Sequence, residues 1–540
     1  MSAGRRAPLA GLVAALAVLV TGCGAGAVEA KRDTVVIVTG AQAQSFAQDS
    51  NGTGYESAEY LANTNATLLR NPYVDGSGGQ ARHQDLYRFE PLLAERYEVS
   101  PDRLTYTFHL DPDARSTAGN PVTAEDVRWS YERKFATATS IVPFVNAPVI
   151  VDPERQIRVL DPMTVSFTVD EPGYGFTLLS LLSNTTAAIY DTTVLKAHVT
   201  PDDPYAVEWS ASNGNWGYGA YGLESFTPGQ QTTYVRNEDY AGGAPPVRRI
   251  IQRVVADAGI RANLLAQGDT HVAAQLRPAD QVGIAETGAQ VFSAPTNAMV
   301  YMPLTTTMAP FDDVAVRRAL ARAVPYEQIV SDVYKGRAEQ LAGMLSPGAP
   351  GYDGDGLVPF RYDPAEARRI LAEAGHTEPV AFTLTVNASV PDLQEAAVQI
   401  QTAARDAGFA ITIEPVPSAA FNEGLAAKTF QASMGRDYAV VQSPPYELAL
   451  FYTADSPINW PDWEDSRFDT ALAAGNAAGD PLSVTAGRSW NAAQRRIQSD
   501  VPTIWMAYVQ PLNAFRGDVG GYVFRTDNTI DYSQLTLEGS

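Results

Sequence analysis

Residues 90–135 carry the clearest structural pattern of the chain, and their first part reads EPLLAERYEVSPDRLTYTFHL (90–110). Apolar residues alternate with polar ones near its end, a pattern typical of a strand buried on one face; they are Leu104, Tyr106, Phe108 and Leu110. The segment NPVTAEDVRWSY (120–131) follows. There Thr123 and the acidic residues after it predict a capped helix start. The stretch therefore predicts a half-buried strand, a turn and a short helix.

The order of these elements also resembles a known family. From Leu93 to Ser130 the chain is similar to the ABC-transporter solute-binding proteins of the oligopeptide/dipeptide/nickel group, family 5. The shared pattern is Leu-Ala-Glu, an aromatic residue, a Ser-x-Asp turn, Tyr-Thr-Phe-x-Leu, and Gly-x-Pro-x-Thr-Ala-x-Asp-Val. Two loops depart from it, at Asp111-Pro112 and at 116–119. The resemblance implies an α/β, bilobal periplasmic-binding-protein-like fold: two lobes joined by two hinge crossings, with an extra small domain (the three-domain, large, cluster C type).

The resemblance continues in separate segments over almost the whole mature chain and implies its domain organisation. The boundaries are 1–22 (signal peptide), 23–32 (lipidated tether), 33–80, 205–293 and 501–540 (domain I), 81–204 (domain II) and 294–500 (domain III, the second lobe). Residues 501–508 resemble the family's apolar return strand, where the chain goes back to the first lobe.

Local patterns predict several elements of domain III. Strand 380–386, helix 393–407 and strand 409–416 predict a βαβ unit with parallel strands. Asp363 before Pro364 predicts the start of a helix that ends at Gly375. A second helix is expected over 489–499, with Ser489 as its cap.

The first 23 residues have the pattern of a targeting segment. Arg5 and Arg6 precede an apolar run from Leu9 to Val20, which is too short to span a bilayer stably. The run ends in Val-Thr-Gly-Cys (20–23), which resembles the bacterial lipobox, and Cys23 is the chain's only cysteine. This predicts an extracytoplasmic protein anchored to the bacterial membrane by lipidation at Cys23. An ordinary signal peptide with an incidental cysteine is the alternative.

Composition narrows the class of function. The 540 residues carry 39 basic and 61 acidic side chains, a formal charge of −22. Such acidity disfavours nucleic acid as a partner. We found no phosphate-binding loop and no nucleophile elbow. The five histidines are scattered without metal-ligand spacing. We therefore expect no enzyme activity, no cofactor and no metal, although folding can assemble a hydrolase site from distant residues.

The resemblance directs attention to Asp437, which follows a short strand in domain III. Peptide-binding members of the family place an Asp there, which pairs with the ligand's α-ammonium. A charged hydrogen bond of this kind is strong in a closed cleft. Arg436 could instead neutralise Asp437, and Arg436 or Lys428 could answer a ligand carboxylate. The full set of candidate ligand-binding residues is Asp437, Tyr438, Arg436, Trp216, Tyr218, Tyr55, Asn63 and Trp460.

The expected function is that of a solute-binding lipoprotein of an ABC importer. It would bind short peptides between two closing lobes, act as a monomer, and deliver its ligand to a permease with ATPase subunits. Three alternatives stay open. The first is another solute, such as a glycan fragment, an opine, haem or a metal chelate; the second is a lipoprotein hydrolase; the third is a signalling receptor subunit.

Overall fold

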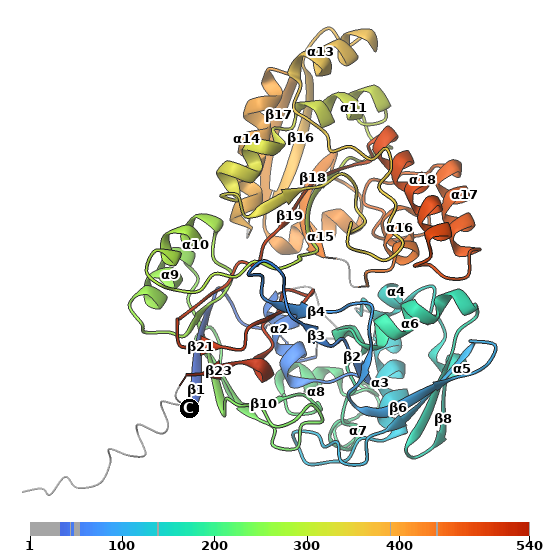
Figure 1. Cartoon of the computed structure of the whole chain (residues 1–540), viewed down its shortest axis with the longest axis vertical. Helices are drawn as coiled ribbons and strands as arrows, with labels where there is room; N and C mark the ends of the chain where they lie inside the picture. Colours follow the sequence, from blue (N-terminus) through green and yellow to red (C-terminus); the bar gives the residue numbers. More distant parts are fainter. Residues whose placement is uncertain are drawn as a thin grey trace, which may run out of the picture.

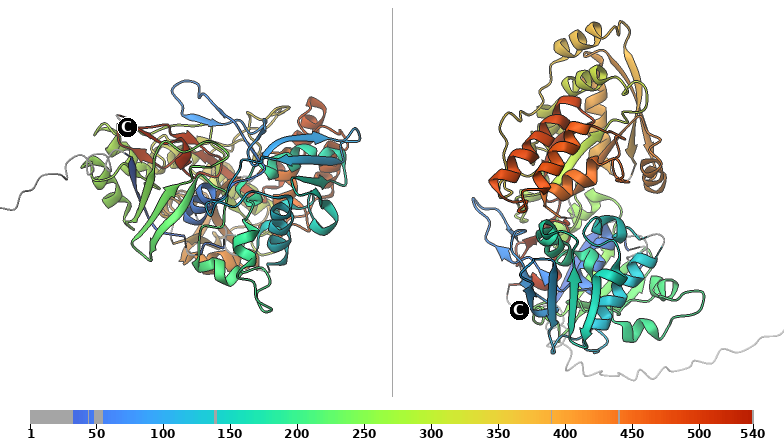
Figure 2. Two further views of the ribbon diagram at one scale, coloured as in Figure 1. Left: turned by 90° about the horizontal axis from the view of Figure 1, so that it is seen from below. Right: turned by 90° about the vertical axis from the view of Figure 1, so that its right-hand side faces the viewer.

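The protein is a two-lobed α/β molecule (Figure 1). The computed structural model describes residues 33–538, apart from 44, 48–54, 138–139, 389 and 439–440. The expected signal peptide, tether and Cys23 therefore lie outside the described residues. Each lobe is built around one six-stranded sheet. The two lobes remain distinct when the molecule is turned about its long axis (Figure 2, right).

The sheet of the first lobe has the order β10-β11-β12-β1-β13-β20. Its strands are β1 (Thr34–Thr39), β10 (Tyr221–Thr227), β11 (Gln231–Arg236), β12 (Arg249–Val254), β13 (Val272–Ala273) and β20 (Ala514–Phe515). The central strand β1 is apolar, runs parallel to β12 and β13, and has fully buried Val35 and Ile37 in the core. Strands β12 and β13 pair with its two edges, which places it inside the sheet.

A four-stranded antiparallel sheet, β6-β7-β9-β8, forms the smaller domain of the first lobe. Its strands are β6 (Ala94–Val99), β7 (Thr105–Leu110), β8 (Ile157–Asp161) and β9 (Thr164–Thr168). Alternate residues of β7 are buried, as its pattern predicted. Helix α3 (Ala124–Ala136) follows, and Thr123 and Asp126 form its capping box. Both predictions for the opening stretch are confirmed.

The boundary of this domain differs from the expected one at residue 81. Strand β4 (Arg82–Gln84) pairs with β3 (Tyr73–Val74) and with β22 (Val523–Phe524) near the C-terminus. The four-stranded sheet starts only with β6. The physical reason is the backbone pairing of β4, which joins it to C-terminal residues rather than to β6–β9.

The second lobe contains a sheet of order β15-β19-β14-β18-β16-β17. Its strands are β14 (Ala298–Pro303), β15 (Ala338–Gln340), β16 (Val380–Asn387), β17 (Phe409–Val416), β18 (Ala432–Tyr438) and β19 (Thr503–Val509). Strands β16 and β17 run parallel, joined by α14 (Pro391–Arg405), which confirms the βαβ prediction. Helix α13 (Pro364–Glu373) starts after its Asp363 cap, also as predicted.

Two predictions for the end of this lobe are wrong. The last long helix, α18 (Val484–Asp500), begins earlier than expected, because Ser483 rather than Ser489 accepts the capping hydrogen bond from the Ala486 N–H. Strand β19 was expected to belong to the first lobe. It pairs with β14 and β15 of the second sheet, so the chain returns after Val509 rather than at residue 501.

Two chain crossings connect the lobes and touch each other. The first lies between α10 (Pro278–Ala285) and β14, and the second lies between β19 and β20. The Ala294 N–H of the first crossing donates to Gln510 Oε1 of the second at 2.8 Å. Away from the crossings, α16 (Pro444–Tyr452) of the second lobe meets the first lobe, where the Tyr446 hydroxyl donates to the Val145 carbonyl at 2.7 Å.

Candidate functional site in the cleft between the lobes

A cavity of about 220 Å³ lies between the lobes, beside the second crossing. Its walls come from α2 (Tyr55–Thr64) and the C-terminal segment on the first lobe, and from β14 and β18 on the second. The lining residues are Tyr55, Ala58, Gln275, Ala298, Arg436, Asp437, Tyr438, Val509, Gln510, Pro511, Leu512, Asn513, Asp527 and Asn528. A molecule held here contacts both lobes at once.

Asp437 supplies the carboxylate of the second-lobe wall. It lies near the end of β18, opposite Met299 of β14. Its Oδ1 accepts the N–H of Tyr438 at 2.8 Å, and no cationic side chain among the described residues pairs with it. The side chain is exposed to the cavity, whose walls come from both lobes. Desolvation by these walls raises the pKa of the Asp437 carboxyl to about 6. The site therefore holds a carboxylate to which no described residue supplies a counter-charge.

Arg436 does not neutralise Asp437. Successive residues of a strand point to opposite faces of the sheet, so the two side chains diverge. Arg436 Nη1 pairs with Asp392 Oδ2 of α14 at 2.6 Å, and the Tyr334 hydroxyl donates to the same oxygen at 3.1 Å. The expectation that Arg436 lines the site agrees with its place in the cavity wall. Its charge, however, is already balanced by Asp392.

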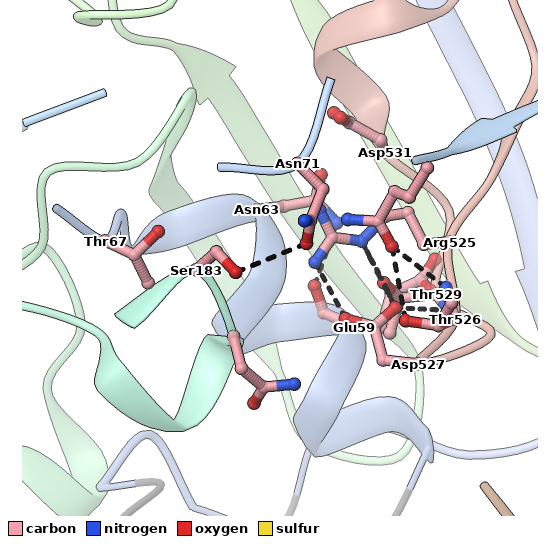
Figure 3. Close-up of polar contacts among 12 residues, drawn as sticks. Glu59, Asn63, Thr67, Asn71, Ser183, Arg525, Thr526, Asp527, Thr529 and Asp531 are labelled. Carbon is pink, nitrogen blue, oxygen red and sulfur yellow. Dashed lines mark hydrogen bonds and ion pairs between the residues drawn. The ribbon is translucent and has the colours of Figure 1, made fainter. Parts of the chain in front are cut away.

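The first-lobe wall contains a second balanced pair, shown in Figure 3. Arg525 Nη2 lies 2.7 Å from Asp527 Oδ2, and Arg525 Nε donates to Thr529 Oγ1 at 3.0 Å. Thr529 in turn donates to Asp527 Oδ1 at 2.6 Å. Asp527 is only 5% exposed, and Arg525 lowers the pKa of its carboxyl against the opposing effect of burial. This network fixes the C-terminal segment that closes the cavity.

Behind Tyr55, α2 is tied to the C-terminal segment by two buried polar side chains. Glu59 accepts from the Ile530 N–H at 2.8 Å and from the Tyr532 hydroxyl at 2.9 Å. Burial nevertheless raises the pKa of its carboxyl to about 7. Asn63 donates to the Ile530 carbonyl at 2.9 Å and accepts from the Tyr532 N–H at 2.8 Å. Asn63, an expected ligand-binding residue, is thus occupied in holding the wall.

Of the remaining expected residues, Tyr55 and Tyr438 line the cavity, from opposite lobes. Trp216 and Tyr218 do not line it, because both are buried in the core of the first lobe. The Tyr218 hydroxyl donates to Asp126 Oδ2 at 3.1 Å, which links it to the capping box of α3. Trp460 packs against the aromatic core of the second lobe, beside Tyr301.

The sequence did not identify the residues of the crossing and the C-terminal segment that line the cavity. They are Gln275, 509–513, Asp527 and Asn528. They follow no motif, and more than two hundred residues separate Gln275 from its neighbours at the crossing. Only the pairing of β19 and β20 in different sheets brings these segments to the cleft.

The geometry defines a two-lobed solute-binding protein, and comparison with known proteins agrees. A model of the family described as "Bacterial extracellular solute-binding proteins, family 5 Middle" matches residues 88–458. The chain therefore belongs to the family 5 solute-binding proteins of ABC transporters. Within the described residues, no helix is both long enough and apolar enough to cross a membrane.

Three relatives illustrate the range of the family. The chain is 26% identical over 438 residues to the probable D,D-dipeptide-binding periplasmic protein DdpA of Escherichia coli K12, covering 80% of this chain and 81% of DdpA. The structure of DppA from Helicobacter pylori in complex with peptide STSA has a TM-score of 0.78 at 21% identity, covering 95% and 100%. MoaA of A. tumefaciens R10, in complex with mannopinic acid, has a TM-score of 0.78 at 22% identity, covering 94% and 99%.

Proposed function

We propose that this protein binds short peptides by their free amino terminus in the cleft between its lobes and delivers them to the permease of an ABC importer. The proposal rests on one observation: the carboxylate of Asp437 faces the cavity and has no cationic partner among the described residues. A ligand ammonium would supply the missing charge. DdpA, named as a probable D,D-dipeptide-binding protein, supports a peptide ligand.

The proposed mechanism is binding followed by closure, with no turnover. Asp437 and Tyr438 contact the ligand from the second lobe, and Tyr55 and Asn528 contact it from the first. A ligand that touches both walls has a higher affinity for the closed form than for the open one, so it shifts the population toward closure. The closed form is the one that docks on the permease, whose ATPase subunits power import.

The proposal includes an anchor outside the described residues. Lipidation of Cys23 would hold the protein at the outer face of the cell membrane, with residues 24–32 as a tether. Mass spectrometry of the protein extracted from its host membrane tests this part: the mature N-terminus should be a diacylglyceryl-modified Cys23, and an unmodified cysteine would contradict it.

The binding role is tested by Asp437→Asn. The substitution keeps the shape and removes the charge, so peptide affinity should fall by about 1.5–3 kcal/mol, roughly 10–150-fold. Isothermal titration with alanine di-, tri- and tetrapeptides measures the loss. The charge-matched control is Asp269→Asn, on an exposed turn of the first lobe away from the cavity. Equal affinities for the wild-type and Asp437→Asn proteins would refute the assignment.

A further inference from the structure

We infer that the cleft selects its ligand by net charge. It accepts amines whose carboxyl end is blocked, amidated or outside the cavity. It offers no counter-charge to a free C-terminal carboxylate. The inference rests on the proposed function, because it assumes that Asp437 receives the ligand's ammonium. It adds the chemical class of the ligand's other end.

The titratable groups that line the cavity leave one negative charge unbalanced. Arg436 is held by Asp392 at 2.6 Å, and Asp527 is held by Arg525 at 2.7 Å. Only Asp437 has no such partner among the described residues. A monocationic ligand therefore brings the lined cavity to neutrality, whereas a zwitterion leaves it negative. Charges in a cleft that is partly shielded from water interact more strongly than charges in bulk water.

Two further cations do not line the cavity. Lys428, a candidate partner for a ligand carboxylate, pairs with Asp462 at 2.5 Å and lies before the start of β18, at the opposite end of that strand from Asp437. Arg337, behind the second crossing, donates to Gln281 Oε1 at 3.0 Å and to the Phe292 carbonyl at 2.7 Å. Its guanidinium is desolvated, which lowers its pKa, and it does not line the cavity. Neither side chain is placed to meet a carboxylate beside Asp437.

The polar side chains that remain in the wall are neutral: they are the hydroxyls of Tyr55 and Tyr438 and the amides of Gln275, Gln510, Asn513 and Asn528. An amide side chain carries both a donor and an acceptor. It can therefore bond an amidated end or an internal peptide group as well as a carboxylate. Hydrogen bonding in this cavity consequently does not favour the free acid, while the charge of Asp437 disfavours it.

The test compares three forms of each peptide on the purified wild-type protein by isothermal titration. Alanine di-, tri- and tetrapeptides are used with a free C-terminus, as C-terminal amides, and as N-acetylated free acids. We expect the amides to bind as tightly as the free acids or more tightly. Free acids that bind at least threefold more tightly than their amides would overturn the inference.

The N-acetylated forms separate this inference from the proposed function. They lack the ammonium, so they should lose binding by tenfold or more whatever the C-terminus contributes. N-acetylated peptides that bind as well as the free forms would refute the role of Asp437, and so would failure of every free-amine peptide to bind. The preference at the C-terminal end is measured separately, by the affinity ratio of free acid to amide.

A variant that frees a cation in the cavity wall should reverse the preference and favour the free acid. Asp392→Asn removes the partner of Arg436, which already lines the cavity. The affinity ratio of free acid to amide should then rise at least threefold. The matched control is Asp465→Asn, which breaks the 2.6 Å pair with Arg496 far from the cleft and should leave the ratio unchanged. Circular dichroism verifies that both variants fold. An unchanged ratio in Asp392→Asn would overturn the inference.

Discussion

Glu447 offers a prediction whose size can be worked from the structure. It lies in α16, where the second lobe meets the first, and is 5% exposed. No cation among the described residues pairs with it. Tyr87, Tyr446 and Tyr508 lie close enough to interact electrostatically with its carboxylate. Burial raises the pKa of its carboxyl from an ordinary 4.5 to about 8. The folded protein therefore holds this carboxyl protonated at pH 7.

Holding the carboxyl protonated at pH 7 costs about 3 kcal/mol of folding free energy. Because the folded pKa is raised, Glu447 costs nothing below pH 4.5; the cost grows as pH rises and levels off above pH 8 at roughly 5 kcal/mol. Glu447→Gln removes this free-energy cost and keeps the shape of the side chain. We expect the free energy of unfolding at pH 7 to rise by about 3 kcal/mol, or the Tm by roughly 3 °C for a chain of this length.

Thermal unfolding of the wild-type protein and Glu447→Gln at pH 5, 7 and 9 tests this expectation. The gain should be small at pH 5 and largest at pH 9. The exposed Glu95→Gln in β6 is the control and should show no pH-dependent gain. A Tm difference that is the same at the three pH values would refute the reasoning, because it would mean that Glu447 has the same pKa in the folded and the unfolded protein.

Two further predictions concern the cleft and the last helix. Peptide affinity should be highest between about pH 6 and pH 8, because Asp437 has a pKa of about 6 and a peptide amine has a pKa near 8. Below pH 6 the affinity should fall by up to tenfold per pH unit. Titrations from pH 4.5 to 8 measure this fall, and the Asp437→Asn protein should not show it. Gly487→Ala should lower the unfolding free energy by about 1–3 kcal/mol, because the added Cβ would overlap the Gly351 carbonyl oxygen; an unchanged Tm would show that this contact relaxes freely.

Elements with strong local signals could be predicted from the sequence. The alternating β7 and the capped helices α3 and α13 needed only neighbouring residues to define them. Helix α18 starts at Val484 rather than at the predicted Ser489, and Gly487 lies in the part that was not predicted. In the folded protein this glycine lies inside the helix, where the absence of a side chain lets the Gly351 backbone approach. Close approach of another segment has no local signal.

Sheet membership and the cavity wall depend on pairing between distant segments. Strand β19 is buried at every residue, so its apolar sequence fits the sheet of either lobe equally well. Only its pairing with β14 assigns it to the second lobe. The position of Asp437 was predictable from the family pattern. The divergence of Arg436 from it follows from the two-residue period of a strand, but its partner Asp392 lies on a helix 44 residues earlier. Local patterning could not supply that contact.

The proposed role of Asp437 is tested by identifying the small molecules that the protein carries. Purified protein is denatured without added ligand, and the released compounds are identified by mass spectrometry. We predict short peptides with free amino termini, because an ammonium group balances the charge of Asp437. A tightly held compound without an amine would contradict the proposed role of Asp437 while leaving the family membership intact.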